Sequence, residues 1–120
     1  MPGGRRQKYG AVPKAGFAST GEHDRAHALR LQVLAGVISD LQLQVTVPLV
    51  PGISYRLDFV YVETATRRRV WEDWKGVKTP VFKLKAKLWK LVGPGLLRIT
   101  SRHGIEDVES ERRTLSSPRR

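Results

Sequence analysis

The sequence contains no cysteine, few acidic residues and no long apolar run, and each absence excludes a class of protein. Without cysteine, the chain cannot form a disulfide framework, a cysteine-ligated zinc or iron–sulfur site, or a thiol nucleophile. Charge or proline interrupts every apolar run well before the roughly 20 residues that a membrane helix needs. The basic residues within 1–10 are not followed by an apolar stretch. We therefore expect no secretory signal and a soluble, cytoplasmic protein.

Basic residues outnumber acidic ones two to one. The 120 residues include 22 Lys and Arg against 11 Asp and Glu, which gives a formal net charge of +11. Apolar residues make up 40% of the chain, enough for one domain with a modest core. A charge this high on so small a protein indicates a polyanionic partner, and nucleic acid is the commonest one.

The positive charge is concentrated in residues 67–90, which hold nine basic residues and only two acids, Glu72 and Asp73. Binding to DNA through such a segment would depend strongly on salt concentration. The lysines could instead simply solvate a helix, but their closeness in sequence to the two acids favours a role at DNA. The basic residues that we expect to contact DNA are Arg67, Arg68, Arg69, Lys78, Lys83, Lys85 and Lys87.

The chain divides into three parts by composition. Residues 1–16 are rich in glycine, proline and basic residues, which predicts a disordered basic arm. Residues 106–120 are charged and polar and predict a flexible charged tail. The region between them, 17–105, carries the periodic apolar patterns of a folded domain.

Within this domain the patterns predict the order α-β-β-β-α-β, an α+β arrangement. The first helix begins near Ser19, because Ser19-x-x-Glu22 fits a capping box. A second helix begins after Thr79-Pro80, with an apolar side formed by Val81, Leu84, Leu88 and Leu91. Alternation and β-branched or aromatic content predict strands at 41–47, 55–62, 70–75 and 96–100.

Two acids and a lysine on adjacent predicted strands form the candidate site. On strand 70–75 the side chains of Asp73 and Lys75 project to one face and that of Glu72 to the other. A short hairpin could set Asp58 beside Asp73, and two adjacent carboxylates repel each other unless a cation lies between them. Hard oxygen ligands suit Mg²⁺ or Mn²⁺. With a lysine to orient water or neutralise phosphate, this set fits metal-assisted phosphodiester hydrolysis.

Glu22 has two interpretations. It could only complete the capping box with Ser19. It also falls on the helical stripe of Ala26, Leu29 and Val33 that should face the sheet, where a carboxylate is costly without a partner. In the second interpretation Glu22 is a third acid at the metal site.

Asp58 followed by Asp73-Trp74-Lys75 resembles the signature of the PD-(D/E)XK nuclease superfamily, with Leu57 where that signature has proline. Longer stretches, from about residue 17 to 100, are similar to a small phage nuclease-like family and, in motif order, to endonuclease I-type Holliday-junction resolvases. The stretches are Ser19-x-x-Glu22, 35–44, 55–61 and 72–88.

This resemblance implies a restriction-endonuclease-like αβββαβ core with a mixed central sheet and flexible basic termini. It implies that Asp58 and Asp73 bind divalent metal and that Glu22 completes or flanks the site. Lys75 would position the attacking water, and Gln44 would line the site. The implied protein is a Mg²⁺- or Mn²⁺-dependent DNA endonuclease, selective for branched DNA and homodimeric because cutting a four-way junction takes two sites.

Other interpretations remain open on the sequence alone. A nucleic-acid-binding accessory protein could keep the same fold without turnover, and a basic scaffold protein would leave the acids unexplained. His23 and His27 have the spacing of a zinc-protease helix, but His103 is remote in sequence and no third ligand is compelling, so these histidines are expected to contact solvent or phosphate. The tryptophans fit a core or interface better than base stacking. Leu31 falls opposite the buried stripe and could mark a dimer contact.

Overall fold

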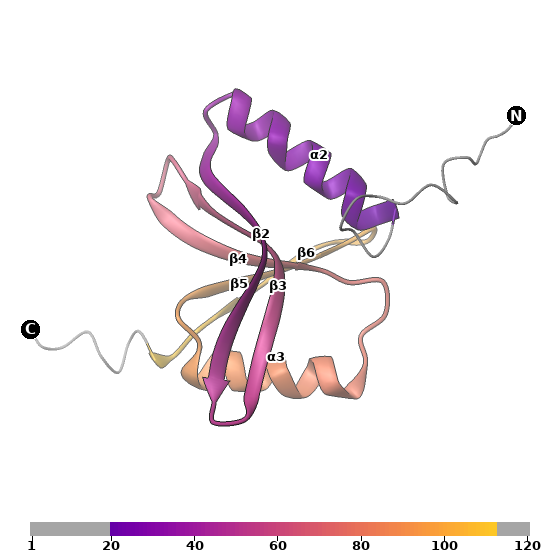
Figure 1. Ribbon diagram of the computed structural model, residues 1–120, viewed down its shortest axis with the longest axis vertical. Coiled ribbons are helices and arrows are strands. Elements are labelled where there is room, and N and C mark those ends of the chain that lie inside the picture. Colours follow the sequence, from indigo (N-terminus) through magenta and orange to yellow (C-terminus); the bar gives the residue numbers. More distant parts are fainter. Residues whose placement is uncertain (1–19, 113–120) are drawn as a thin grey trace, which may run out of the picture.

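The computed structural model describes residues 20–112, which form an α+β domain (Figure 1). The predicted basic arm at 1–16, the capping residue Ser19 and residues 113–120 lie outside this range. The elements, in chain order, are α2 (Thr20–Leu34), β2 (Ile38–Val50), β3 (Ile53–Glu63), β4 (Arg68–Trp74), α3 (Pro80–Val92), β5 (Leu96–Ser101) and β6 (Gly104–Glu109).

The strands form one mixed sheet in the order β2-β3-β4-β5-β6. Neighbours pair antiparallel except β4 and β5, which are parallel and connected through α3. The predicted order α-β-β-β-α-β and the mixed sheet are therefore confirmed, with β6 added. The β2–β3 hairpin turns strongly away from the direction of the other strands (Figure 1), which is the twist expected of long paired strands.

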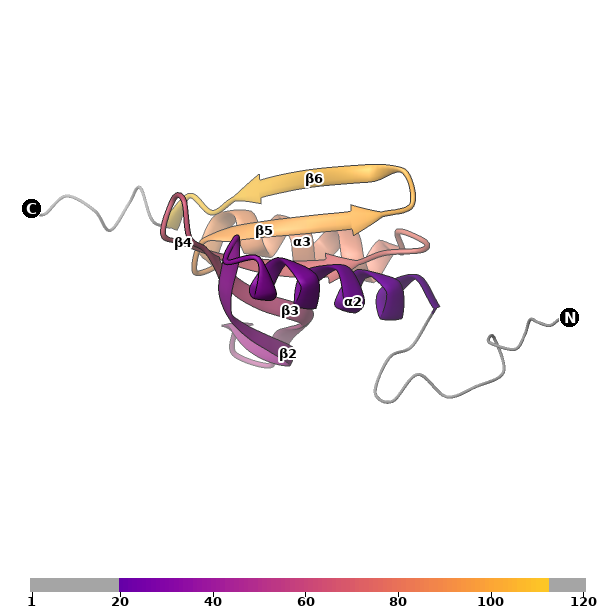
Figure 2. The same ribbon diagram turned by 90° about the horizontal axis from the view of Figure 1, so that it is seen from above.

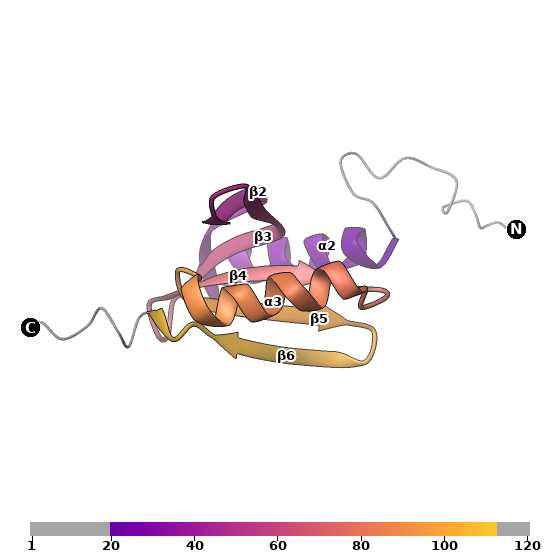
Figure 3. The ribbon, with the colours of Figure 1, turned by 90° about the horizontal axis from the view of Figure 1, so that it is seen from below.

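The two helices cover opposite faces of the sheet (Figures 2 and 3). On one face α2 packs through Ala26 and Leu29 onto a cluster that includes Phe59 and Tyr61. On the other face α3 packs through Phe82 and Trp89 onto a second cluster. The sheet residues of this second cluster are Tyr55, Leu57, Val60, Leu97 and Ile99.

The helix α3 buries a different side from the one its aliphatic pattern indicates. Thr79 caps its start, as predicted, by accepting a hydrogen bond from the Phe82 N–H. Phe82 and Trp89 are buried, whereas Val81, Leu84 and Leu91 are more than half exposed. The two large aromatic side chains bury more apolar surface than the aliphatic ones, and this decides the orientation of the helix.

The boundary predicted at residue 105 is wrong, because β6 continues the fold to Glu109. The acids that made this segment look like a flexible tail are each held by a basic side chain. Arg98 binds Asp107 at 2.9 Å, Lys78 binds Glu106 at 2.8 Å, and Arg68 binds Glu109 at 2.7 Å. Ion pairing between neighbouring segments thus supports an edge strand that has little apolar content of its own.

The first strand is longer than its alternating core predicts. β2 runs to Val50 and includes Pro48, which an edge strand tolerates because that position needs no ladder N–H. Its register shifts between Ser39 and Gln42, and Asp40 and Gln44 adopt positive φ angles of 56°. The shift reflects a bulge or irregularity, which increases local twist.

Candidate active site

The hairpin of β3 and β4 places Asp58 next to Asp73, as predicted. Phe59 pairs with Glu72 across the two strands, so the next position in the register brings Asp58 opposite Asp73. Asp58 Oδ2 accepts a hydrogen bond of 2.8 Å from the backbone N–H of Trp74. The carboxyl groups of Asp58 and Asp73 also lie within hydrogen-bonding reach of each other.

Burial and this contact together change the protonation of the pair. Asp73 is 4% exposed. Burial, together with the neighbouring Asp58, raises the pKa of Asp73 to about 7, although the Tyr55 hydroxyl and Lys75 act in the opposite direction. Burial likewise raises the pKa of Asp58. The pair therefore retains a proton near neutral pH, or takes a cation in its place.

Two further side chains fix Asp73. The Tyr55 hydroxyl donates a hydrogen bond of 2.7 Å to Asp73 Oδ2, and Lys75 Nζ lies 3.2 Å from the same oxygen. The Lys75 ammonium also lies 4.9 Å from the centre of the Phe82 ring of α3, a cation–π geometry. The lysine that was predicted to share a face with Asp73 thus reaches it directly.

Glu22, in the first turn of α2, interacts with Asp58. It is buried in α2, accepts a hydrogen bond of 2.9 Å from Gln44 Nε2, and its charge contributes to the raised pKa of Asp58. Glu22 thus lies beside Asp58, which in turn meets Asp73, so the three acids form a row but are not grouped around one point. Gln44, which donates to it, is held in the left-handed region at φ 56°, a strained conformation that is often found at functional sites.

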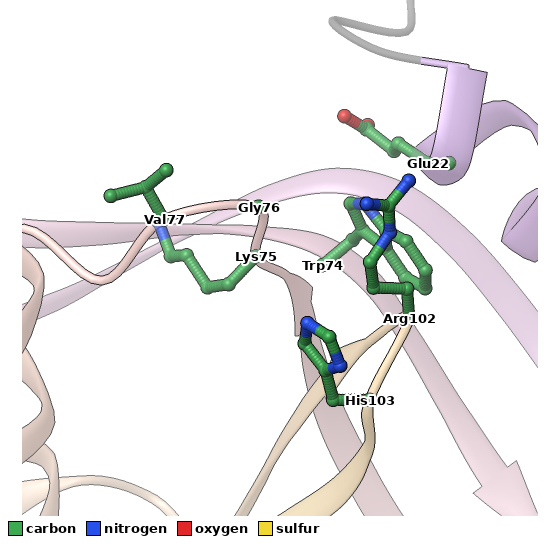
Figure 4. Close-up of a pocket in the computed structure, with 8 residues that line it drawn as sticks. Glu22, Trp74, Lys75, Gly76, Val77, Arg102 and His103 are labelled. Carbon is green, nitrogen blue, oxygen red and sulfur yellow. The ribbon is translucent and has the colours of Figure 1, made fainter.

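A cavity of about 460 Å³ opens beside this row (Figure 4). Glu22 and Lys75 line it together with Trp74 and with Arg102 and His103 of the β5–β6 turn. His103 is remote in sequence from His23 and His27, and the β5–β6 hairpin brings it to the cavity that Glu22 and Lys75 also line. Ser101 and Gly104 flank this turn. These two small residues are the signal in the sequence that indicates a hairpin.

The contact between Tyr55 and Asp73 is the feature that the sequence analysis missed most clearly. Strict alternation places Tyr55 and Asp58 on opposite faces of a strand. However, Leu57 and Val60, three residues apart, pack in the same cluster with Tyr55. The strand therefore twists around Asp58, and the long Tyr55 side chain reaches Asp73.

The donor set fits a small divalent cation. Asp58 and Asp73 offer hard carboxylate oxygens in contact, of the kind that Mg²⁺ and Mn²⁺ prefer. Within residues 20–112, no group of three or more histidine, aspartate or glutamate side chains is already arranged around a common point for a metal. Glu22 meets Asp58 but does not complete such a group, so a bound ion would have Asp58 and Asp73 as its first ligands. His23 and His27 likewise form no such group with another acid or histidine of the described range.

Glu72 lies on the opposite face and belongs to a separate buried network. Its carboxylate is fully buried and accepts hydrogen bonds from Arg25 at 2.6 Å, Tyr61 at 2.6 Å and Thr100 at 3.0 Å. These contacts join α2 to β3, β4 and β5. Glu72 therefore has a structural role, and the predicted separation of Glu72 from Asp73 is confirmed.

The predicted DNA-contacting residues fall into two groups. The first group lies at the start of β4, at the other end of the strand from Asp73, and consists of Arg67, Arg68 and Arg69. Two of these arginines are paired, Arg68 with Glu109 and Arg69 with Asp40. The lysines lie in the loop after β4 and on α3. Lys83 and Lys87 are exposed, Lys85 is half-buried, and Lys78 pairs with Glu106.

No protein-family model, curated protein or solved structure matches this chain. The resemblance to PD-(D/E)XK nucleases therefore gains no support from these comparisons, and the function must be argued from the site itself. Neither described helix has the length and apolar character needed to cross a membrane.

Proposed function

We propose that this chain is a Mg²⁺- or Mn²⁺-dependent endonuclease that hydrolyses phosphodiester bonds in DNA, selective for branched substrates, in the cytoplasm of a phage-infected host. The observation that carries the proposal is the contact of Asp58 and Asp73 with a lysine 3.2 Å from Asp73. A buried and a half-buried carboxyl group with one nearby ammonium form a poor structural pair and a good metal site. The high net charge of +11 favours a polyanionic substrate.

In this mechanism Asp58 and Asp73 would hold the ion and Glu22 would flank it. A bound divalent ion would stabilise charge on the scissile phosphate and lower the pKa of a bound water. The Tyr55 hydroxyl holds the Asp73 carboxylate, and the Gln44 amide holds that of Glu22. Both acids are thereby fixed before substrate arrives, which limits reorganisation during the reaction.

Lys75 positions the attacking water and neutralises the phosphate. The water oxygen forms a bond to phosphorus as the P–O bond to one sugar oxygen breaks. The water loses one proton to solvent, and the departing sugar oxygen gains one. The products are a phosphate-ended strand and a hydroxyl-ended strand. Cutting both strands of a four-way junction needs two such sites, so we propose a homodimer.

A second candidate is a nucleic-acid-binding protein that keeps this arrangement without turnover. It is favoured by one observation, that the Lys75 ammonium already neutralises Asp73 in the place where an ion would bind. Such a protein would bind DNA equally well with and without divalent metal.

A cleavage assay separates the two candidates. Supercoiled plasmid and a synthetic four-way junction are incubated with the full chain in Mg²⁺, in Mn²⁺ and in EDTA. We expect cleavage in the presence of metal that Asp73→Asn abolishes while DNA binding persists. Asp40→Asn is the matched control, because Asp40 is an exposed acid on β2. Its backbone is in the left-handed region, a conformation that asparagine tolerates. Cleavage that survives Asp73→Asn, or that proceeds in EDTA, would contradict the proposal.

A further inference from the structure

A second cavity of about 440 Å³ adjoins the one beside the acids. The two cavities share Gly21, Trp74 and Arg102 as lining residues. Trp74 and Arg102 therefore lie between the acidic row and a further space that the proposed hydrolysis does not use. Figure 4 shows both side chains between His103 and Glu22.

Trp74 is held rigidly where it borders both cavities. A Cβ atom on Gly21 would lie 2.5 Å from Cζ2 of the indole, so the ring packs directly on the backbone of the first turn of α2. The Trp74 backbone is tied to Asp58 through its N–H. The side chain is only half-buried. A fixed aromatic ring that borders open space costs little ordering entropy when a flat ligand stacks on it.

Arg102 is an exposed cation in the β5–β6 turn, and no described residue forms a hydrogen bond or ion pair with its side chain. Arg25, which lines the second cavity as well, is bound through its guanidinium to Glu72. The acid of this cavity, Asp24, is 70% exposed and lies 3.7 Å from His23. Arg102 is thus free to bind a phosphate with its planar donor fork.

We propose that Trp74 and Arg102 form a subsite for an unpaired nucleotide next to the cleaved bond, with its base stacked on the indole and its phosphate bound by the guanidinium. The identity of the ligand as DNA rests on the proposed function. A paired base is stacked within its duplex and must be extruded at a cost of a few kcal/mol to reach such a ring, whereas a base at a fork or branch is already free. The subsite thus supplies a physical reason for selecting branched DNA.

The test compares binding of two fluorescently labelled DNAs to the full chain by anisotropy, in EDTA so that nothing is cut. One probe is a fork with unpaired arms, and the other is a fully paired duplex of equal length. The variants are Arg102→Ala, Trp74→Leu and Trp74→Phe. Lys90→Ala is the matched control, because Lys90 is an exposed cation in the last turn of α3, on the face of the sheet away from α2.

We expect Trp74→Leu to weaken fork binding about tenfold or more, the order that loss of a base-stacking contact produces. Arg102→Ala should weaken fork binding by a similar factor, because it removes a charge-assisted contact to the phosphate. Binding of the paired duplex should change less than about twofold, because its bases are stacked on one another and do not reach the indole. Trp74→Phe should restore most of the fork affinity, and Lys90→Ala should not change the preference for the fork. Fork binding should also quench tryptophan fluorescence in the wild type and less so in Trp74→Phe.

Equal loss on fork and duplex, or no loss on either, would overturn the subsite. Because Arg102 lies in an exposed turn, its variant tests the proposal even if Trp74→Leu fails to fold. The two proposals fail separately. Fork preference that depends on Arg102 without metal-dependent cutting would retain the subsite and remove the nuclease, whereas Asp73-dependent cutting without fork preference would do the reverse.

Discussion

The Lys75 ammonium lies 3.2 Å from Asp73 Oδ2, two residues further along the same chain. Alternation brings both side chains to one face, and the twist of the neighbouring strand adds the Tyr55 hydroxyl to the same carboxyl oxygen. Asp73 is therefore the point where a lysine, a tyrosine and a second aspartate meet. Each of these contacts leads to a separate testable prediction.

Replacing Lys75 by alanine should slow cleavage about 100-fold or more, the range for removing a group that positions or activates a nucleophile. Binding of the junction should weaken only slightly, since one lysine among many contributes little to total charge neutralisation. Single-turnover cleavage and binding in EDTA measure the two effects separately. Lys90→Ala, which replaces an exposed lysine in the last turn of α3, is the control. Equal cleavage rates in the two variants would exclude a role for Lys75 in the reaction.

The stability of the metal-free protein should fall as pH rises from about 4 to about 7. In this window the folded state retains a proton on Asp73, whose pKa is about 7, whereas the unfolded chain, with a pKa near 3.8, has already lost it. The unfolded state therefore binds fewer protons, and the free energy of unfolding decreases with pH. Asp58 acts in the same direction, because its pKa is also raised.

Asp73→Asn removes this contribution and should be more stable than the wild type at pH 8 by about 1–4 kcal/mol, on the basis of 1.36 kcal/mol for each pKa unit. At pH 4 the two proteins should be nearly equal. Urea unfolding in EDTA at several pH values measures the difference, with Asp40→Asn following the wild type throughout. A difference that grows toward low pH would contradict the assignment of the proton to this pair.

Tyr55→Phe should weaken metal binding most at lower pH. The hydroxyl donates to the Asp73 carboxylate and so favours its charged form. Without it, Asp73 gives up its proton at higher pH, and Mg²⁺ or Mn²⁺ must compete with that proton over a wider range. Isothermal titration with Mn²⁺ between about pH 6 and 8 should show the deficit shrinking as pH rises. A deficit that is constant with pH would indicate that Tyr55 acts only through packing.

The sequence predicts the acid pair well because the pair depends on local rules. A short turn joins two strands of clear pattern, so the register between Asp58 and Asp73 follows from hairpin geometry. Alternation then gives the faces of Glu72 and Lys75. The same reasoning finds Glu22, because a carboxylate on an apolar helical stripe needs a partner.

The missed features depend on tertiary contacts that local rules do not contain. Tyr55 reaches Asp73 only because β3 twists, which breaks the alternation between Leu57 and Val60. The strand β6 is held by ion pairs to distant basic residues, such as Arg98 with Asp107, and its composition alone resembles a solvated tail. The buried side of α3 is decided by Trp89 fitting the second cluster, which the aliphatic spacing does not indicate.

The last prediction concerns the buried network on the other face. Arg25 binds Glu72 through two hydrogen bonds of 2.6 and 3.0 Å, and Glu72 is fully buried. Arg25→Met keeps much of the side-chain volume but leaves the carboxylate with only the donors of Tyr61 and Thr100. We expect a loss of about 3–5 kcal/mol in the free energy of unfolding, as for other buried pairs broken on one side.

Arg69→Met is the control for that substitution, because the exposed pair of Arg69 with Asp40, at 3.3 Å, should contribute less than about 1 kcal/mol. The double variant Arg25→Met with Glu72→Gln should recover part of the loss, since no uncompensated charge then remains buried. Because Glu72 lies on the face away from Asp73, the recovered protein should also keep its cleavage activity. Activity lost in a stably folded double variant would show that the α2 face contributes to the reaction, and Glu72 would then have to be counted with the acids of the site.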